Sequence, residues 1–104
     1  MMSEAYEKLK AVGVDVTWLG GNCPVQAEGV IEGNLLFYFR ARGSSWQFHI
    51  WPVGRECYDD DIFLHEEDFG EGFDAGWMEK ETALGLMLKA AEKFKADEIR
   101  KANP

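Results

Sequence analysis

Apolar and polar residues alternate through the middle of the chain, and this pattern predicts three consecutive antiparallel strands. The apolar positions of the three runs are Val25, Ala27, Gly29 and Ile31, then Leu35, Phe37, Phe39 and Ala41, then Trp46, Phe48 and Ile50. Because side chains point to opposite faces at every second residue, each run gathers its apolar side chains on one face. We therefore expect an antiparallel meander with one buried face.

The loops between these runs set the register of the strands. A three-residue loop at 32–34 places Ile31 opposite Leu35 and keeps the apolar positions on one face. A two-residue loop would mix the faces, because a one-residue slip turns every side chain over. A four-residue loop at 42–45 gives the third strand the same facing, so both loops predict one buried surface.

A short helix and a further strand are predicted before the first of these three strands. Residues 3–11 are predicted to form a short helix with Ser3 as the N-cap. Residues 14–19 alternate again and predict another strand, on which Val14, Val16 and Trp18 share a face.

The period becomes helical from about Gly76 to Ala102, and Asn103 and Pro104 are expected to end this helix. Its apolar stripe consists of Trp77, Leu84, Met87, Leu88, Ala91 and Phe94. A helix of this length can cover the apolar face of the sheet. The predicted fold class is therefore α+β, in one domain spanning 1–104: an N-terminal helix, a meander of three to five strands, and a long C-terminal helix packed on one face.

Charge narrows the choice of partners. The chain of 104 residues carries 19 acidic and 11 basic residues, a net charge of −8. This field repels nucleic acids and anionic membranes and attracts basic surfaces, so we expect no direct nucleic-acid or membrane binding.

No apolar run approaches a bilayer span, and the N-terminus has no secretion signal, so a cytoplasmic location is expected. The two cysteines are expected to be free thiols.

The stretch 58–74 is rich in carboxylates and contains no lysine or arginine. We expect a loop here, with at most a short edge strand at 62–65. The leading hypothesis is a non-enzymatic binding protein that uses these acids and Phe69, as an anchor, to engage a protein with a basic surface. The acids in this prediction are Asp59, Asp60, Asp61, Glu66, Glu67 and Asp68. The alternative is that the acids only keep the protein in solution.

The same registers predict what lies on the reverse face of the sheet. One row joins Glu28, Tyr38 and His49, a second joins Gln26, Arg40 and Gln47, and a third joins Val30, Leu36 and Trp51. The second hypothesis is a small-ligand or peptide binder that uses Tyr38, Arg40, His49 and Trp51 on this open face. In the alternative interpretation, the third row packs under the N-terminal helix or another strand.

Candidate chemistry is sparse. His49, His65, Cys23 and Cys57 are the residues with nitrogen or sulfur ligands for zinc, but no spacing among them forms a metal-binding motif, so no metal and no cofactor are predicted. A small enzyme with a reactive Cys23 is the third hypothesis, although the sequence places no cation beside that thiol. The sequence thus favours binding over catalysis, and leaves a homodimer through an exposed sheet edge open.

Part of the chain carries a resemblance. The segments that carry it, within residues 18–50, are Gly20-Gly21-Asn22-Cys23-Pro24-Val25-Gln26-Ala27-Glu28-Gly29 and Phe37-Tyr38-Phe39-Arg40-Ala41-Arg42-Gly43. This part resembles small uncharacterised proteins of phages and bacterial accessory genomes. The resemblance implies a context only, that of inhibitors of host defence or immunity partners of toxins, and transfers no functional residue.

Overall fold

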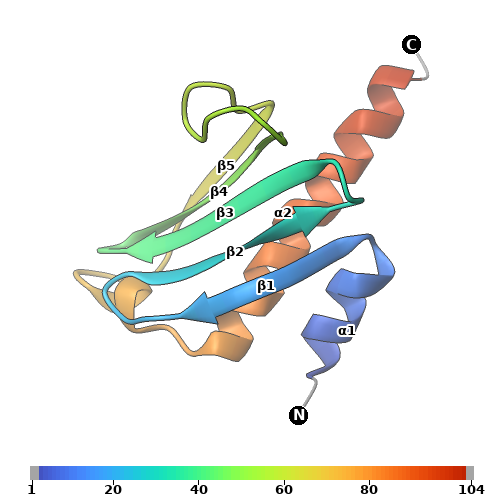
Figure 1. Ribbon diagram of the computed structural model, residues 1–104. Coiled ribbons are helices and arrows are strands. Elements are labelled where there is room, and N and C mark those ends of the chain that lie inside the picture. The colour runs from blue at the N-terminus through green and yellow to red at the C-terminus, as the bar shows by residue number, and fades with distance from the viewer. Residues whose placement is uncertain (1–2, 103–104) are drawn as a thin grey trace.

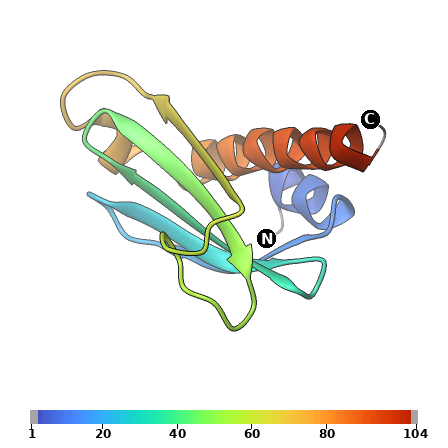
Figure 2. The same cartoon turned by 90° about the horizontal axis from the view of Figure 1, so that it is seen from above.

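Five antiparallel strands form one sheet in the order β1-β2-β3-β4-β5 in the computed structural model, which describes residues 3–102 (Figure 1). The elements are α1 (Glu4–Ala11), β1 (Val14–Gly20), β2 (Val25–Ile31), β3 (Leu35–Arg42), β4 (Ser45–Pro52), β5 (Phe63–Asp68), the 3-10 turn η1 (Asp74–Trp77) and α2 (Lys80–Ala102). Both helices lie on one side of the sheet, where they contact each other (Figure 2). The predicted α+β class is confirmed.

The predicted strand register is also confirmed. Ile31 lies opposite Leu35 across the three-residue loop, and Phe39 lies opposite Phe48. The next turn is shorter than expected, because Arg42 already pairs with Ser45 and only two residues remain between the strands. The pairing of the apolar positions is unchanged by this shortening.

The face of the sheet that the helices cover, called the inner face below, is the core. The rings of Phe37 and Phe48 stack there with centroids 5.2 Å apart. Helix α2 contributes the fully or almost fully buried side chains of Ala83, Leu84, Met87, Ala90, Ala91 and Phe94. Helix α1 adds Leu9, and Ser3 caps this helix as predicted by accepting a hydrogen bond from the Tyr6 backbone N–H. Each of the larger apolar side chains, such as Leu9, Met87 and Phe94, contributes about 1.5–3 kcal/mol when buried.

The start of the long helix differs from the prediction. Helix α2 begins at Lys80 rather than near Gly76, and Trp77 belongs to η1 with 65% of its surface exposed. The backbone of Gly76 does not join the helix, because its carbonyl accepts a hydrogen bond from the Cys23 N–H in the β1–β2 turn. The predicted end of the helix at Asn103 and Pro104 lies outside the described residues.

The facing of Trp18 was predicted wrongly. A β-bulge between Val16 and Trp18 shifts the register, so that Trp18 lies opposite Glu28 and Leu19 opposite Ala27. Because the bulge adds one residue to β1, Trp18 points to the face opposite the core and is 48% exposed.

The acidic stretch is more regular than expected. Strand β5 runs through Glu66, Glu67 and Asp68, which were predicted to lie in a loop. It pairs with β4 over its whole length and alternates between half-buried and exposed residues. An edge strand tolerates such charges because its outer edge faces water, and they also discourage pairing with another chain.

Candidate functional site

The face of the sheet turned away from both helices, called the outer face below, carries the rows expected from the sequence. Strand pairing places Glu28, Tyr38 and His49 in one row and Gln26, Arg40 and Gln47 in another. Strand β5 extends the second row with Glu66. A further row joins Arg42, Ser45 and Asp68 near the β3–β4 turn.

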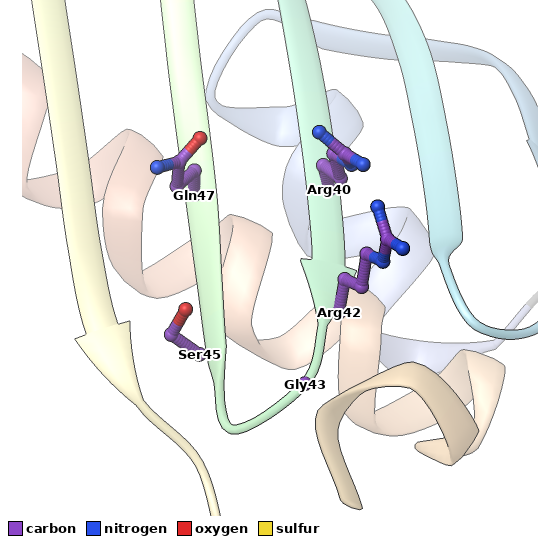
Figure 3. A pocket seen from close by; sticks show the side chains of 5 residues that line it. All are labelled: Arg40, Arg42, Gly43, Ser45 and Gln47. Atoms are coloured by element: carbon purple, nitrogen blue, oxygen red, sulfur yellow. The ribbon is translucent and has the colours of Figure 1, made fainter. Parts of the chain in front are cut away.

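Two arginines form the basic side of this face. A hollow of about 360 Å³ is lined by Arg40, Arg42, Gly43, Ser45 and Gln47. Figure 3 shows both arginine side chains on β3, with Ser45 and Gln47 on the neighbouring strand and the helices behind the sheet. Within residues 3–102 neither arginine has a carboxylate at ion-pair distance. Their guanidinium groups therefore remain available to an anionic group.

Carboxylates form the opposite side of the face, across β4. A second, shallow groove of about 550 Å³ is lined by Ser44, Ser45, Glu66, Glu67 and Asp68. Ser45 belongs to both hollows, so the basic and acidic sides adjoin. The Gln47 amide bridges them, because its Nε2 donates a hydrogen bond of 2.8 Å to Glu66 Oε2.

Glu67 has a different environment from its neighbours. Its carboxylate accepts a hydrogen bond of 2.9 Å from Lys89 Nζ on α2 and contacts His65 Nε2 at 2.6 Å. These two partners, Lys89 first, lower the pKa of the Glu67 carboxyl. Glu67 thus ties the edge of the sheet to the helix layer.

An apolar hollow lies at the other end of the outer face. It has a volume of about 240 Å³, and its lining includes Val30, Leu36 and Trp51 together with Thr17 and Glu28. The third predicted row is therefore confirmed as a row, and α1 does not cover it, since that helix lies on the inner side (Figure 2). The hollow has the size and lining to receive an apolar side chain.

His49 does not lie on an open surface, contrary to the sequence-based expectation. The β4–β5 connection, residues 53–62, covers it and leaves only 1% of the residue exposed. Asp61 Oδ2 lies 2.6 Å from His49 Nδ1, and the Tyr58 ring meets the imidazole edge-on with centroids 4.4 Å apart. Burial, with the Asp61 charge as a second cause, raises the pKa of the nearby Cys57 thiol to about 11.

Tyr38 and Trp51, the other aromatic residues predicted for this face, are half-buried. The Tyr38 hydroxyl donates a hydrogen bond of 2.8 Å to Gln26 Oε1, and burial raises the pKa of this phenol. No ion pair forms between Glu28 and Arg40 in the described part of the chain.

The six predicted acids do not form one patch. Asp60 and Asp61 accept backbone hydrogen bonds from Glu56 and Tyr58 within the 53–62 segment. Asp59 is exposed there, whereas Glu66, Glu67 and Asp68 lie in β5. Phe69, the predicted anchor, is half-buried and packs against the core. Only part of the predicted acidic surface, Glu66 and Asp68, thus belongs to the outer face.

Cys23 is an exposed free thiol in the β1–β2 turn. Among residues 3–102 no side chain forms a hydrogen bond or an ion pair with its sulfur. Lys80 Nζ donates hydrogen bonds to the Gly21 carbonyl and to Asn22 Oδ1 of the same turn, so this cation is directed at those oxygens and not at the thiol.

Arg42 and Ser45 were not among the residues predicted for a site. A signal for them existed, because Arg42 follows Arg40 by two residues and therefore shares its face. Their pairing beyond the predicted end of the strands was missed because the turn was expected to be longer.

The sequence matches no model of a known protein family, and comparisons with curated proteins and with solved structures return no match either. Neither described helix combines the length and apolar character needed to cross a membrane. The outer face must therefore be interpreted from its own chemistry.

Proposed function

We propose that this chain is a non-enzymatic binding protein that holds a peptide segment of a protein partner against the outer face of its sheet. The observation that carries the proposal is the arrangement of charge across β4. Arg40 and Arg42 stand on one side of that strand, and Glu66 and Asp68 stand on the other.

The chemistry of the two sides defines the partner. A guanidinium group binds a carboxylate through two parallel hydrogen bonds, so the arginine hollow suits an aspartate or glutamate of the partner. Glu66 and Asp68 suit a lysine or arginine. Because neighbouring strands are about 4.8 Å apart, β3 and β5 place these charges roughly 10 Å apart. The partner segment should present opposite charges at a similar separation.

The remaining features of the face support the same kind of ligand. The hollow lined by Val30, Leu36 and Trp51 can bury an apolar side chain, which supplies affinity that exposed charges alone do not. Half-buried Tyr38 lies between this hollow and the arginines. Charges select the partner and set the speed of association, while the apolar contact holds it.

A peptide-display selection against the purified protein tests the proposal. We expect enriched peptides to carry an acidic and a basic residue. The double variant Arg40→Ala/Arg42→Ala should bind them at least about tenfold more weakly, as for the loss of one charge-assisted pair. The control Lys93→Ala/Lys101→Ala makes the same change in net charge on α2 and should bind normally. Equal binding by both double variants would refute the proposal.

A second candidate function is favoured by the segment after β5. Phe73 and Trp77 are 70% and 65% exposed there, and the exposed carboxylates Glu71 and Asp74 accompany them in sequence. Exposed aromatic rings among carboxylates suit a partner with a basic surface. Binding of a basic partner in this way is the role expected for an inhibitor or immunity-type protein of a mobile element. It predicts that selected peptides are purely basic and lose binding with Phe73→Ser/Trp77→Ser rather than with Arg40→Ala/Arg42→Ala.

A further inference from the structure

Three side chains with different metal-ligating atoms converge beneath the 53–62 segment. They are His49 from β4 and Cys57 and Asp61 from the segment itself, and their ligand atoms all lie within 4.8 Å of one another. The other two zinc-ligand candidates of the sequence lie elsewhere, with Cys23 in the β1–β2 turn and His65 on the inner face beside Trp46. This convergence was not visible in the sequence, where the three residues form no motif.

Both ring nitrogens of His49 face hydrogen-bond acceptors. Glu66 is an acceptor, so the Gln47 group 2.8 Å away must be the amide N–H₂. The Gln47 carbonyl oxygen then faces His49 Nε2 at 3.1 Å. His49 Nδ1 faces a second acceptor, the Asp61 carboxylate, so an ion bound at Nδ1 would leave the ring hydrogen on Nε2, where the Gln47 carbonyl oxygen can accept it.

This arrangement calls for a positive charge between the imidazole and the carboxylate. Nδ1 and Asp61 Oδ2 are 2.6 Å apart, and both side chains are largely buried. A proton on Nδ1 satisfies this need, and so does a metal ion that both atoms ligate. The Cys57 sulfur, at the same point, supplies a third ligand that a shared proton does not use.

We propose that His49 Nδ1, Cys57 Sγ and an Asp61 carboxylate oxygen form a binding site for Zn²⁺, with Gln47 orienting the imidazole. Sulfur, imidazole and carboxylate together are a zinc donor set, and the sulfur disfavours Mg²⁺ and Ca²⁺. Metal-ligating histidines regularly donate their other N–H to a fixed acceptor, and Gln47 Oε1, 3.1 Å from His49 Nε2, is placed to be that acceptor. The fourth position of a tetrahedral site is left to water or a ligand group.

The geometry requires only small adjustments to accept the ion. Zinc–ligand bonds of about 2.0–2.3 Å place tetrahedral ligand atoms roughly 3.3–3.8 Å apart. The 2.6 Å separation of Nδ1 and Oδ2 must therefore open by roughly 0.7–1.2 Å, and a separation of 4.8 Å must close by roughly 1.0–1.5 Å. Two of the three ligands belong to the 53–62 segment, so metal binding would fasten this segment over β4. The proposal does not depend on the proposed function.

Titration of the full chain, freed of metal by a chelator, with Co²⁺ tests the site. A cobalt–thiolate bond gives a charge-transfer band in the near ultraviolet, and we expect this band to saturate at one equivalent and to vanish when Zn²⁺ displaces the cobalt. Cys57→Ala should lose the band, and the matched control Cys23→Ala should keep it. A wild-type protein without the band would overturn the proposal, as would a band that is lost in the Cys23 variant and kept in the Cys57 variant.

A second readout uses the wild-type protein and is independent of how the variants fold. Thiol alkylation, located by mass spectrometry, should show that Zn²⁺ protects Cys57 and leaves Cys23 reactive. Equal labelling of Cys57 with and without Zn²⁺ would contradict the site. Gln47→Leu tests the positioning role, and we expect it to weaken Co²⁺ binding by about 10- to 100-fold while the charge-transfer band is retained at saturation. Unchanged affinity would remove Gln47 from the site.

Discussion

The inner and outer faces of the sheet share the same five strands but carry side chains of different chemistry. Alternate residues of β3 and β4 place Phe37 and Phe48 under the helices and Arg40 and Gln47 on the opposite side. Backbone pairing is common to both faces, so it cannot explain why one is apolar and the other charged. Burial under α1 and α2 requires apolar side chains on the inner face, and the helices place no such requirement on the outer face.

The largest effect is expected from a substitution in the inner face. Phe48→Ala removes a fully buried ring that stacks on Phe37 and should lower the free energy of unfolding by about 3–5 kcal/mol. Urea denaturation followed by circular dichroism measures this loss. A loss below about 1 kcal/mol would mean that the inner face is not the tightly packed layer described here.

A second change tests how closely β1 approaches the core strands near its bulge. A Cβ on Gly29 would lie 2.0 Å from the Asp15 carbonyl oxygen and 2.7 Å from the Phe37 ring. Because one of these contacts is with backbone, Gly29→Ala should destabilise the protein by about 1–3 kcal/mol. The control is Gly33→Ser in the neighbouring loop, where a side chain meets no atom within 4 Å but φ is +80°. Its cost should be smaller, and the reverse order in thermal melting would argue against the bulge.

The outer face should respond weakly in the same stability assays. Arg40→Ala and Arg42→Ala remove side chains that form no ion pair within residues 3–102, so each should change the unfolding free energy by about 0.5 kcal/mol or less. Binding of selected peptides should fall in the same variants. A loss of stability as large as that of Phe48→Ala would show that the arginines serve the fold instead.

The smallest effect concerns the link between the edge strand and the helix layer. The pKa of Glu67 is lowered in the folded protein by Lys89 and His65, so this contact stabilises the fold above the carboxyl's ordinary value of 4.5. The contribution is lost as pH falls through the lowered pKa. Because Lys89 is exposed, the contribution of its pair with Glu67 should be well under 1 kcal/mol.

The variant Lys89→Ala measures this contribution through the difference in melting temperature from the wild type. The difference should be present at pH 7 and should shrink in strong acid, and Lys93→Ala on the same helix should show no such change. A difference that grows as the pH falls would have the wrong sign for a carboxylate stabilised by its partners.

The parts of this structure that local pattern determines could be predicted from the sequence. The facing of Phe37, Phe39 and Phe48 follows from alternation and loop length, which involve only neighbouring residues. The face to which Trp18 points was predicted wrongly because it depends on a β-bulge. A bulge cannot be recognised from the apolar pattern of a run of seven residues.

The candidate site was less predictable for a related reason. His49 was assigned to the correct face, but its burial depends on residues 53–62 folding back over β4 and on Asp61 reaching its imidazole. Such contacts join parts of the chain that share no period. The arrangement of opposite charges across β4 could not be predicted, because it depends on β5 pairing with β4 and the acidic stretch was expected to be a loop.

The most direct test of the binding face is an amide chemical-shift map recorded with a peptide from the selection. If the outer face binds the peptide, the largest shifts fall on the outer rows of β3, β4 and β5, at Arg40, Arg42, Ser45, Gln47, Glu66 and Asp68. Shifts confined to α2, to Asp59 and its neighbours, or to the segment from Glu71 to Trp77 would contradict it.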